Sequence, residues 1–460
     1  MQQEKNIRQL VLEMLLAVTK KEGGEYSHKV IRDVQNKYNY LSTQEKAFMK
    51  RLFEGTLERM IELDYCIDCY SKVKVNKMKP VIRNIMRMGV YQILYMDSVP
   101  DSAACNESVK LAQAKGFATL KGFVNGVLRT IARNKDAIPY PDEKKDYRKY
   151  LSVTYSMPEW IVDLWIGQFG QETTTAMLQG LLQERPVTIR MRTEDEKAVE
   201  ALRADLEKQG GTLKRHPYLS YAYVIEKTDD LTQLSGFEEG AFVIQDISSM
   251  LAVEALGLPK MDNQGTLKIL DICAAPGGKS MLAADILNHA DIDYMLEARD
   301  ISEYKVELMQ ENFNRCHLNK AKAVAWDALE PDERWLGQAD VVIADIPCSG
   351  LGVIGRKRDI KYKMTPQAVQ DIVELQEKIL KVAASYVKKG GKLLFSTCTV
   401  NKDENEAHVK WIQDTLKMTP VSLNGTLPGL VHSPTTQQGF VQLIPGMQDT
   451  DGFFISVFEK

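Results

Sequence analysis

The chain reads Asp271-Ile272-Cys273-Ala274-Ala275-Pro276-Gly277-Gly278-Lys279-Ser280 at the end of a short apolar run, residues 268–272. This pattern predicts a buried strand, a tight glycine turn and the start of a helix, whose backbone N–H groups can approach a ligand. A phosphate-binding P-loop would need glycine five residues before Gly278, where this chain has Cys273, and the spacing of a dinucleotide fingerprint is absent as well. The turn therefore indicates another kind of cofactor site, or an ordinary strand-to-helix connection.

Strand and helix patterns alternate from about residue 240 onwards. Short apolar runs are separated by helical stretches, notably 301–315 and 366–387. Such alternation predicts a doubly wound α/β fold with a parallel sheet, which binds ligands at the carboxyl ends of its strands. The expected strands are 268–272, 294–298, 321–324, 341–344 and 392–396.

Acidic residues follow the second and third of these strands. Asp300 lies 22 residues after Gly278, and Asp327 follows the third strand. An acidic residue about 20 residues beyond such a turn is placed to hold ribose hydroxyls, and Asp327 could receive an adenine amino group. The positions favour a nucleotide-type ligand over the alternative, which is a pair of capping carboxylates at an ordinary turn.

The residues before 240 have different patterns. Apolar positions recur at helical spacing near the N-terminus, and Ser42 with Glu45 three residues later predicts the capped start of a helix. Alternation of apolar and polar residues after a proline-containing linker predicts a small α+β domain. The expected parts are 1–135 (all helical), 136–184 (linker and helices), 185–240 (small α+β domain) and 241–460 (α/β domain).

Composition places the chain among globular proteins with more than one domain. It has 460 residues, of which 44% are hydrophobic and 26% charged. No apolar run approaches the roughly 18 residues that span a bilayer, and the N-terminus has no signal-peptide pattern. The seven scattered cysteines indicate a reduced, cytoplasmic protein. Cys66-x-x-Cys69 resembles half a zinc site, but no second pair completes it, so we expect no metal.

Charge is distributed unevenly along the chain. The formal net charge is −3, yet residues 1–135 contain 23 Lys and Arg against 14 Asp and Glu. The stretch from Lys72 to Arg87 has no acidic residue. This asymmetry is typical of a basic module that meets a polyanion such as RNA, and equally of a solvated helix face.

Two cysteines follow apolar runs in the α/β part. Cys348 stands in Asp345-Ile346-Pro347-Cys348-Ser349-Gly350, and Cys398 stands in Ser396-Thr397-Cys398-Thr399. Both are expected where a parallel sheet opens its crevice, which favours thiol chemistry beside a bound cofactor. The alternative for each is a buried structural thiol, the commoner fate of an isolated cysteine.

The motifs around Gly277, Cys348 and Cys398 together closely resemble those of the NOL1/NOP2/Sun RNA cytosine-C5 methyltransferases. Residues 245–249 and 451–454 resemble that family too, and the likeness covers about 185–460. It implies a class I, Rossmann-like methyltransferase domain that uses S-adenosylmethionine. By that match the cofactor site is lined by Cys273, Ala274, Ala275, Pro276, Gly277, Gly278, Lys279, Asp300, Asp327 and Asp345.

The N-terminal part resembles the antitermination factor NusB in residues 88–95, 106–109 and 123–129. The fusion resembles the Sun/RsmB branch, which implies an RNA-binding helical domain and a cytosine of small-subunit (16S) ribosomal RNA as substrate. The alternatives are an enzyme for transfer RNA or another ribosomal RNA position and, in another class, a non-catalytic antitermination or assembly factor. We expect a cytoplasmic monomer whose partner is ribosomal RNA, with no membrane or metal.

The resemblance also implies catalytic roles. Cytosine C5 becomes nucleophilic once a thiolate has added to C6, so Cys398 is expected to form that bond. Asp345 is expected to hydrogen-bond N3, and Cys348 to assist release. A basic loop after Cys348 could hold the phosphates beside the target base. Its residues are Arg356, Lys357, Arg358 and Lys361, and the second and third replace a His-Pro pair often seen in the family.

Overall fold

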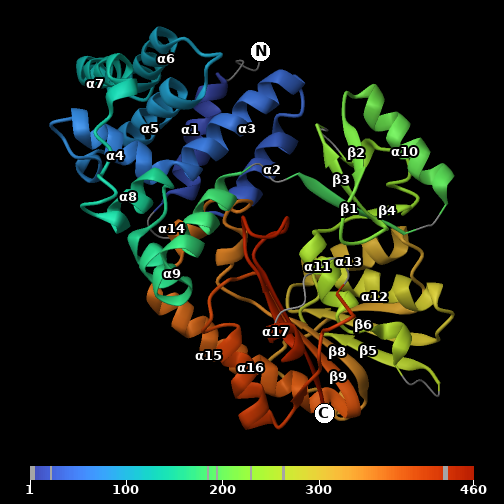
Figure 1. The fold of residues 1–460 in the computed structure, drawn as a ribbon. Helices are drawn as coiled ribbons and strands as arrows, with labels where there is room; N and C mark the ends of the chain where they lie inside the picture. The colour runs from blue at the N-terminus through green and yellow to red at the C-terminus, as the bar shows by residue number, and fades with distance from the viewer. Residues whose placement is uncertain are drawn as a thin grey trace. The chain divides into compact units, whose positions relative to one another are not determined.

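The computed structural model describes residues 6–20, 23–183, 186–192, 195–227, 231–261, 265–427 and 434–460. They form two compact units (Figure 1). Unit 1 contains the chain up to Leu182 together with Ile354–Lys363, and unit 2 contains Gln183–Val353 and Met364–Lys460. A short segment after Cys348 thus folds with the N-terminal helices. The domain boundary expected at 184–185 lies outside the described residues.

Helices make up the regular structure described in unit 1. Their buried faces meet in one core around residues such as Leu15, Phe53 and Leu128. The predicted capping box is confirmed, because Ser42 N–H donates to the Glu45 carboxylate and Glu45 N–H donates to Ser42 Oγ. The helices are α1 (Ile7–Val18), α2 (Ser27–Lys37), α3 (Thr43–Glu58), α4 (Met60–Tyr70), α5 (Pro80–Tyr95), α6 (Asp101–Ala114), α7 (Lys121–Arg133), α8 (Tyr147–Thr154), α9 (Glu159–Leu182, broken at Gly170) and α14 (Ile360–Lys363).

The smaller sheet of unit 2 is antiparallel, with strand order β2-β3-β1-β4. Apolar residues on one face of the sheet pack against a single helix, which confirms the predicted small α+β domain. The alternation of Val187, Ile189 and Met191 with polar residues predicts β1, and residues 221–225 predict β3, whereas β2 and β4 were not predicted. The elements are β1 (Val187–Met191), α10 (Glu196–Lys208), β2 (Thr212–Arg215), β3 (Ala222–Glu226) and β4 (Phe242–Ile244).

The larger sheet has the order β10-β12-β9-β8-β5-β6-β7, and β11 also pairs with β12. The five predicted strands, β5 to β9, run parallel as expected. Sequence patterns did not predict the last three strands, which add an antiparallel edge beside β9. The strands are β5 (Leu267–Asp271), β6 (Tyr294–Asp300), β7 (Ala321–Ala325), β8 (Ala339–Asp345), β9 (Val387–Thr397), β10 (Thr419–Pro420), β11 (Phe440–Leu443) and β12 (Phe453–Glu459).

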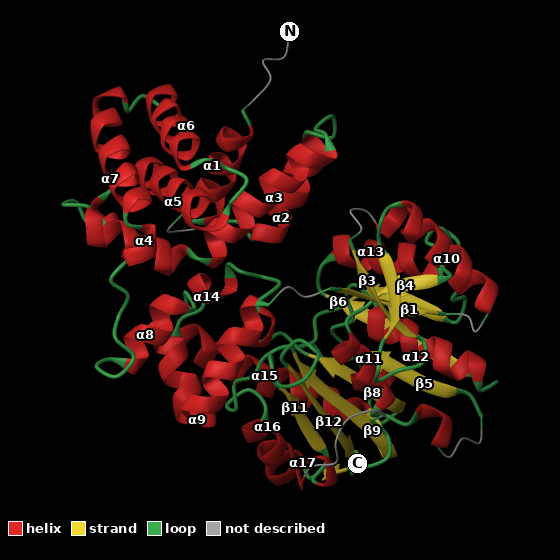
Figure 2. Ribbon diagram, turned by 45° about the horizontal axis from the view of Figure 1, so that its top comes forward, coloured by secondary structure: helices red, strands yellow, loops and turns green. Residues whose placement is uncertain are grey.

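Helices cover both faces of this sheet (Figure 2). Alternate strand residues point to opposite faces, so Ile269 and Ile343 join one apolar core while Leu270 and Val342 join another. Helices α11 (Ile247–Glu254), α12 (Gly278–His289) and α13 (Glu303–Arg315) contribute to the first core, and α15 (Pro366–Tyr386) and α16 (Glu406–Trp411) to the second. The short α17 (Pro434–Gln437) precedes β11. Since both faces are covered, a ligand has access at the strand ends.

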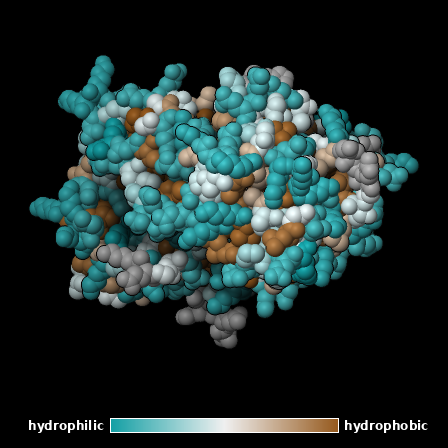
Figure 3. All heavy atoms as spheres, turned by 90° about the horizontal axis from the view of Figure 1, so that it is seen from below, coloured by the Kyte–Doolittle hydropathy of each residue, from teal (hydrophilic) through white to brown (hydrophobic). Residues whose placement is uncertain are grey.

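The described helices include none that is long and apolar enough to cross a membrane. Figure 3 shows hydrophilic side chains over much of the face that it presents, with apolar side chains in limited patches.

Candidate active site

The carboxyl ends of the parallel strands meet at a cavity of about 470 Å³ in unit 2. Consecutive parallel strands end at the same edge of a sheet, so residues far apart in the sequence lie together there. The structure brings the following predicted residues to the cavity wall: Cys273, Ala275, Asp300, Asp327, Asp345, Cys348 and Cys398. Apolar side chains, among them Ile301, Leu329 and Ile379, form the rest of the wall.

The glycine turn after β5 contributes shape rather than side chains. Gly277 has a φ of +97°, and a Cβ there would lie 3.2 Å from the Phe313 ring. Only glycine adopts this conformation without strain. Its N–H donates to Ala274 O at 2.7 Å, and Gly278 begins α12. Ala274, Gly277 and Gly278 therefore form the turn, and Pro276 lies exposed beside it.

Two carboxylates stand at the ends of β6 and β7. Asp300 accepts hydrogen bonds from Ser302 N–H at 3.1 Å and from Lys305 Nζ at 3.3 Å. Asp327 accepts one from Leu329 N–H at 2.9 Å. These bonds fix the direction of both carboxylates on the cavity wall, where each is a hydrogen-bond acceptor for hydroxyl or amino groups of a ligand.

Asp345, the last residue of β8, is held by two side chains. Lys279 Nζ donates to one carboxylate oxygen at 2.6 Å, and Ser396 Oγ donates to the other at 2.8 Å. The Lys279 ammonium also lies 5.2 Å from the centroid of the Phe453 ring. Lys279 is thus a partner of Asp345, and the pair fixes the orientation of the carboxylate in the cavity.

The sulfur atoms of Cys348 and Cys398 lie 3.3 Å apart on the cavity wall. The hydrogen bond to Cys398 and burial raise the pKa of Cys348 well above its usual range, and the charge of Glu404 adds to this effect. Cys348 therefore keeps its proton. Burial also raises the pKa of Cys273, with Asp271 and Asp345 as additional causes. Cys273 consequently forms part of the wall and is a poor nucleophile.

Backbone contacts lock the loops that carry the two thiols. Gly352 N–H donates to Cys398 O at 3.1 Å, and Gly452 N–H donates to Gly352 O at 2.9 Å. A Cβ on Gly352 would lie only 2.1 Å from Gly452 O. The loops after β8 and β9 and the turn before β12 can approach this closely only because both positions are glycine.

Sequence reasoning missed one residue near the site and left another open. Trp326, next to Asp327, could be read as a core residue or as one that packs near the cofactor, and it lines the cavity. Glu404 is completely buried and accepts hydrogen bonds from both thiol loops. It belongs to the charged stretch Lys402–Glu406, a composition typical of a solvated turn, so no sequence signal distinguished it.

The basic residues after Cys348 separate into two groups. Arg356 and Lys357 are exposed, as expected of residues that contact phosphates. Arg358 instead forms ion pairs within unit 1, with Glu54 at 3.1 Å and with Glu58 at 3.0 Å. Contact with RNA through the exposed pair stays a prediction, whereas the structure gives Arg358 a structural partner.

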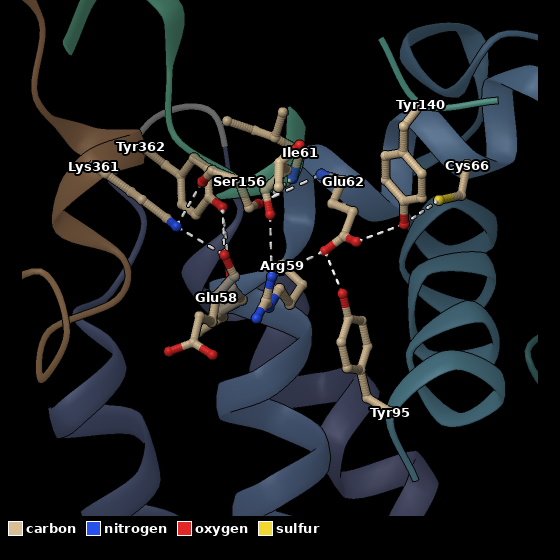
Figure 4. A network of polar contacts seen from close by, with 12 residues as sticks. Glu58, Arg59, Ile61, Glu62, Cys66, Tyr95, Tyr140, Ser156, Lys361 and Tyr362 are labelled. Carbon is tan, nitrogen blue, oxygen red and sulfur yellow. Dashed lines mark hydrogen bonds and ion pairs between the residues drawn. The ribbon is translucent and has the colours of Figure 1, made fainter. Parts of the chain in front are cut away.

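Lys361 is buried in unit 1 (Figure 4), with an exposed fraction of 2%. Its Nζ donates to Glu58 O at 2.8 Å and to Ser156 O at 2.7 Å, and the neighbouring Tyr362 hydroxyl donates to Leu57 O. Burial lowers the pKa of Lys361 to about 7. Two of its N–H groups are used by main-chain carbonyls, so Lys361 anchors the segment to the helices where the sequence predicted a phosphate contact.

Within the described ranges, no group of three or more His, Cys, Asp or Glu residues is arranged to hold a metal ion. Cys66 is buried in unit 1, and Cys69 on the same helix is exposed. Burial raises the pKa of Cys66 to about 12. The Cys66-x-x-Cys69 pattern therefore divides between a core thiol and a surface thiol.

Three segments of the chain match known protein families. Residues 258–459 match the family described as 16S rRNA methyltransferase RsmB/F. Residues 5–133 match the NusB family. Residues 157–232 match the ferredoxin-like domain of RsmF/B-like methyltransferases. The matches follow the order of the helical part, the small α+β domain and the α/β domain.

Similar proteins extend over the whole chain. A protein of Bacillus subtilis (strain 168), named probable ribosomal RNA small subunit methyltransferase B, is 34% identical over 462 residues, 99% of each chain. Ribosomal RNA small subunit methyltransferase B of Escherichia coli O1:K1 / APEC is 28% identical and covers 100% of each chain. The crystal structure of PH0851 shares the fold with a TM-score of 0.77 at 21% identity, covering 99% of this chain and 98% of that one. The chain therefore belongs to the 16S rRNA methyltransferase RsmB/F family, with a NusB-family domain at its N-terminal end.

Proposed function

We propose that this methyltransferase moves a methyl group from S-adenosylmethionine to C5 of a cytosine in 16S ribosomal RNA, while Cys398 is bonded to C6. The observation that carries the proposal is the pair of thiols 3.3 Å apart on a cavity that also contains Asp345. A covalent route divides one difficult step into two easier ones, and it needs one sulfur to bond and a nearby group to assist its departure. A purely RNA-binding factor has no use for this pair.

The cavity residues suit the proposed cofactor. Asp300 can accept hydrogen bonds from ribose hydroxyls, and Asp327 can accept one from an adenine amino group. The apolar side chains of Ile301 and Leu329 can cover the faces of the base. The cofactor supplies a methyl group bonded to a positively charged sulfur, and this group would face the two thiols.

Cys398, Asp345 and Cys348 each have a separate role in the proposed reaction. Cys398 adds as a thiolate to C6, and Asp345 holds the proton at N3 while the electron pair reaches C5. After C5 has taken the methyl group, its proton passes to a water molecule as base. The electron pair of that C–H bond re-forms the C5–C6 double bond while Cys398 departs from C6 as a thiolate and N3 gives its proton back, which restores the aromatic ring. Cys348 has kept its proton because of its raised pKa, so it can hydrogen-bond the departing sulfur of Cys398.

The proposed partner is small-subunit ribosomal RNA. The NusB-family domain has an excess of Lys and Arg over Asp and Glu, and the exposed Arg356 and Lys357 would contact phosphates that flank the target base. The target base must be unpaired or flipped before a thiol can reach C6. We further propose that the chain acts in the cytoplasm, where its seven free thiols would stay reduced, and that it acts as a monomer and without a metal.

Radiolabelled methyl transfer with the full chain tests the proposal. The full chain and labelled S-adenosylmethionine are incubated in separate reactions with naked 16S RNA, with assembled small subunits and with transfer RNA. The labelled nucleoside is then identified by mass spectrometry. The comparison includes Cys398→Ala and, as a matched control, Cys316→Ala, which alters a buried thiol away from the cavity.

We expect 5-methylcytidine in 16S RNA with the wild type and with Cys316→Ala, and none with Cys398→Ala. Methyl transfer that survives Cys398→Ala would overturn the nucleophile. A labelled nucleoside other than 5-methylcytidine would overturn the reaction at C5. Labelling of transfer RNA alone would contradict 16S RNA as the substrate. Failure to label any RNA would favour a binding role without catalysis.

A further inference from the structure

Glu404 is buried behind the two thiol loops, with an exposed fraction of 0%, and is not a lining residue of the cavity. Its two oxygens accept five hydrogen bonds. Oε2 accepts from Ser349 N–H at 2.8 Å and from Gln376 Nε2 at 3.1 Å. Oε1 accepts from the Ser349 hydroxyl, from Thr399 Oγ1 at 3.3 Å and from Asn401 Nδ2 at 3.2 Å.

The donors connect the two loops directly. Ser349 is the residue after Cys348, and Thr399 is the residue after Cys398, so one carboxylate binds the immediate neighbour of each thiol. The hydroxyls of Ser349 and Thr399 also lie 2.8 Å apart. Burying a charged carboxylate is costly, and the five hydrogen bonds offset that cost only in part, since burial still raises the pKa of Glu404. A simpler apolar contact would have packed the same space without that cost.

The third anchor comes from helix α15. Gln376 Nε2 donates to Glu404 and also, at 2.9 Å, to Pro347 O, the carbonyl just before Cys348. The loop that carries Cys348 is therefore held on both sides of the thiol. Because α15 packs on the sheet, this anchor relates the position of Cys348 to the rigid part of the domain.

We propose that Glu404 is a positioning residue for the release step, since its carboxylate holds the loop of Cys348 against the loop of Cys398 so that the two sulfurs face each other. The inference rests on the proposed function, in which Cys348 assists the departure of Cys398. It adds a residue that touches neither the substrate nor the cofactor and acts through the thiol loops.

The charge of Glu404 favours the same outcome. The hydrogen bond to Cys398 and burial raise the pKa of Cys348, and the negative charge of Glu404 raises it further. A protonated Cys348 can donate a hydrogen bond to the departing sulfur, whereas an ionised one would repel it. The contact with Cys398 and burial keep Cys348 protonated even without this charge, so the positions of the two loops decide whether Cys348 can act on the departing sulfur.

Glu404→Gln tests the proposal in the full chain. The amide oxygen can still accept from Ser349 N–H and Gln376, but the amide N–H groups take the place of the oxygen that accepts from Ser349 Oγ, Thr399 Oγ1 and Asn401 Nδ2. Asn401 loses its acceptor, so the tie to the loop of Cys398 is weakened. Burial raises the pKa of Glu404, so its ionised form is a cost to the folded state at neutral pH, and the neutral amide removes that cost. This gain offsets the lost hydrogen bonds, so we expect the unfolding temperature of the variant to stay close to that of the wild type.

The matched control is Glu254→Gln. Glu254 is another largely buried acid of unit 2, its pKa is raised by burial, and it accepts a hydrogen bond from the Tyr221 hydroxyl away from the thiols. Three quantities are measured for both variants, for the wild type and for Cys348→Ala. They are the thermal unfolding temperature, the rate of the first methyl transfer with enzyme in excess, and the steady-state fraction of protein bonded to RNA on denaturing gels.

We expect Glu404→Gln to retain the first methyl transfer within a few-fold while multiple turnover falls about 10- to 100-fold and the protein–RNA adduct accumulates. Glu254→Gln should resemble the wild type in all three quantities. The proposal is overturned if Glu404→Gln turns over like the control, or if both of its rates fall together with its unfolding temperature. If Cys348→Ala accumulates no adduct, Cys348 has no role in release and the proposal for Glu404 is overturned with it, whereas the nucleophile is tested separately by Cys398→Ala.

Discussion

The sulfur atoms of Cys348 and Cys398 lie 3.3 Å apart although 50 residues separate them in the chain. The reason is the register of β8 and β9, in which Asp345 stands opposite Ser396 at the carboxyl ends of adjacent parallel strands. Each thiol follows its strand by a few residues, so the sheet itself brings them together. The two thiols differ in their surroundings, since Cys348 is the one whose pKa is raised further by the nearby buried charge of Glu404.

Cys348→Ala should trap the covalent complex with RNA. The variant keeps Cys398, so the bond to C6 can still form, but the departing sulfur loses its hydrogen-bond donor. We expect a protein–RNA species that persists on denaturing gels, with product formation limited to about one turnover. Cys316→Ala, a change at a buried thiol outside the cavity, should show no such species. An adduct absent from Cys348→Ala would remove this residue from the release step.

Asp345→Asn should abolish most of the activity and leave the fold intact. The amide keeps the shape of the side chain but gives up the charge paired with Lys279, and it no longer offers a carboxylate to a protonated N3. We expect the single-turnover rate of methyl transfer to fall by about 10²-fold or more. The control is Asp340→Asn at the opposite end of β8, where the carboxylate accepts from Lys268 N–H. Equal loss in both variants would assign Asp345 a role in folding only.

The sequence predicted the parallel part of the sheet because its strands are short apolar runs separated by helical stretches. The antiparallel edge was missed for identifiable reasons. Strand β10 has only two residues, Thr419 and Pro420, and a proline argues against a strand. Strand β12, Phe453–Glu459, is buried on both faces and shows no alternation that separates it from a buried helix. Its pairing with β9 joins segments that are distant in the sequence, so no local pattern predicts it.

Motifs pointed to seven residues that line the cavity, and contacts between distant segments account for what the motifs missed. The stretch from Arg356 to Lys361 has the composition of an exposed basic loop. Arg358 nevertheless pairs with Glu58, the last residue of α3, which lies 300 residues earlier. Lys361 contacts the main chain of the same residue. Burial of this kind depends on which helix the segment meets, and no local pattern encodes that. Glu404 was missed for the same reason.

Gly352→Ala should loosen the thiol loops. A Cβ at this position would meet backbone atoms of Gly452 that cannot move aside as a side chain could, so the loop after β8 must shift. We expect the free energy of unfolding to fall by about 1–3 kcal/mol. We also expect a smaller fraction of the protein to be bonded to RNA on denaturing gels. Gly126→Ala serves as the control, because nothing lies within 4 Å of a Cβ there and its helical position tolerates alanine. Wild-type stability in Gly352→Ala would show that the loops have room to separate.

Lys361 should make the stability of unit 1 depend on pH. Burial lowers the pKa of Lys361 to about 7, whereas an unfolded lysine keeps a pKa near 10.4. Between these values the unfolded chain binds the proton and the folded chain does not. The free energy of unfolding must therefore rise with pH across this window, by at most about 1.4 kcal/mol per pH unit, and the full cost of the buried charge is present below about pH 7.

Lys361→Met isolates this contribution, because methionine keeps an apolar stem of similar length and cannot bind the proton. Thermal and urea unfolding of the full chain are followed at pH 7, 8 and 9, with hydrogen exchange of α3 peptides reporting on unit 1. We expect the stability of the wild type relative to Lys361→Met to increase with pH. Lys50 is an exposed lysine of α3, and Lys50→Met should show no such trend relative to the wild type. A constant difference between the wild type and Lys361→Met would mean that Lys361 stays protonated in the folded chain and is balanced by Glu58.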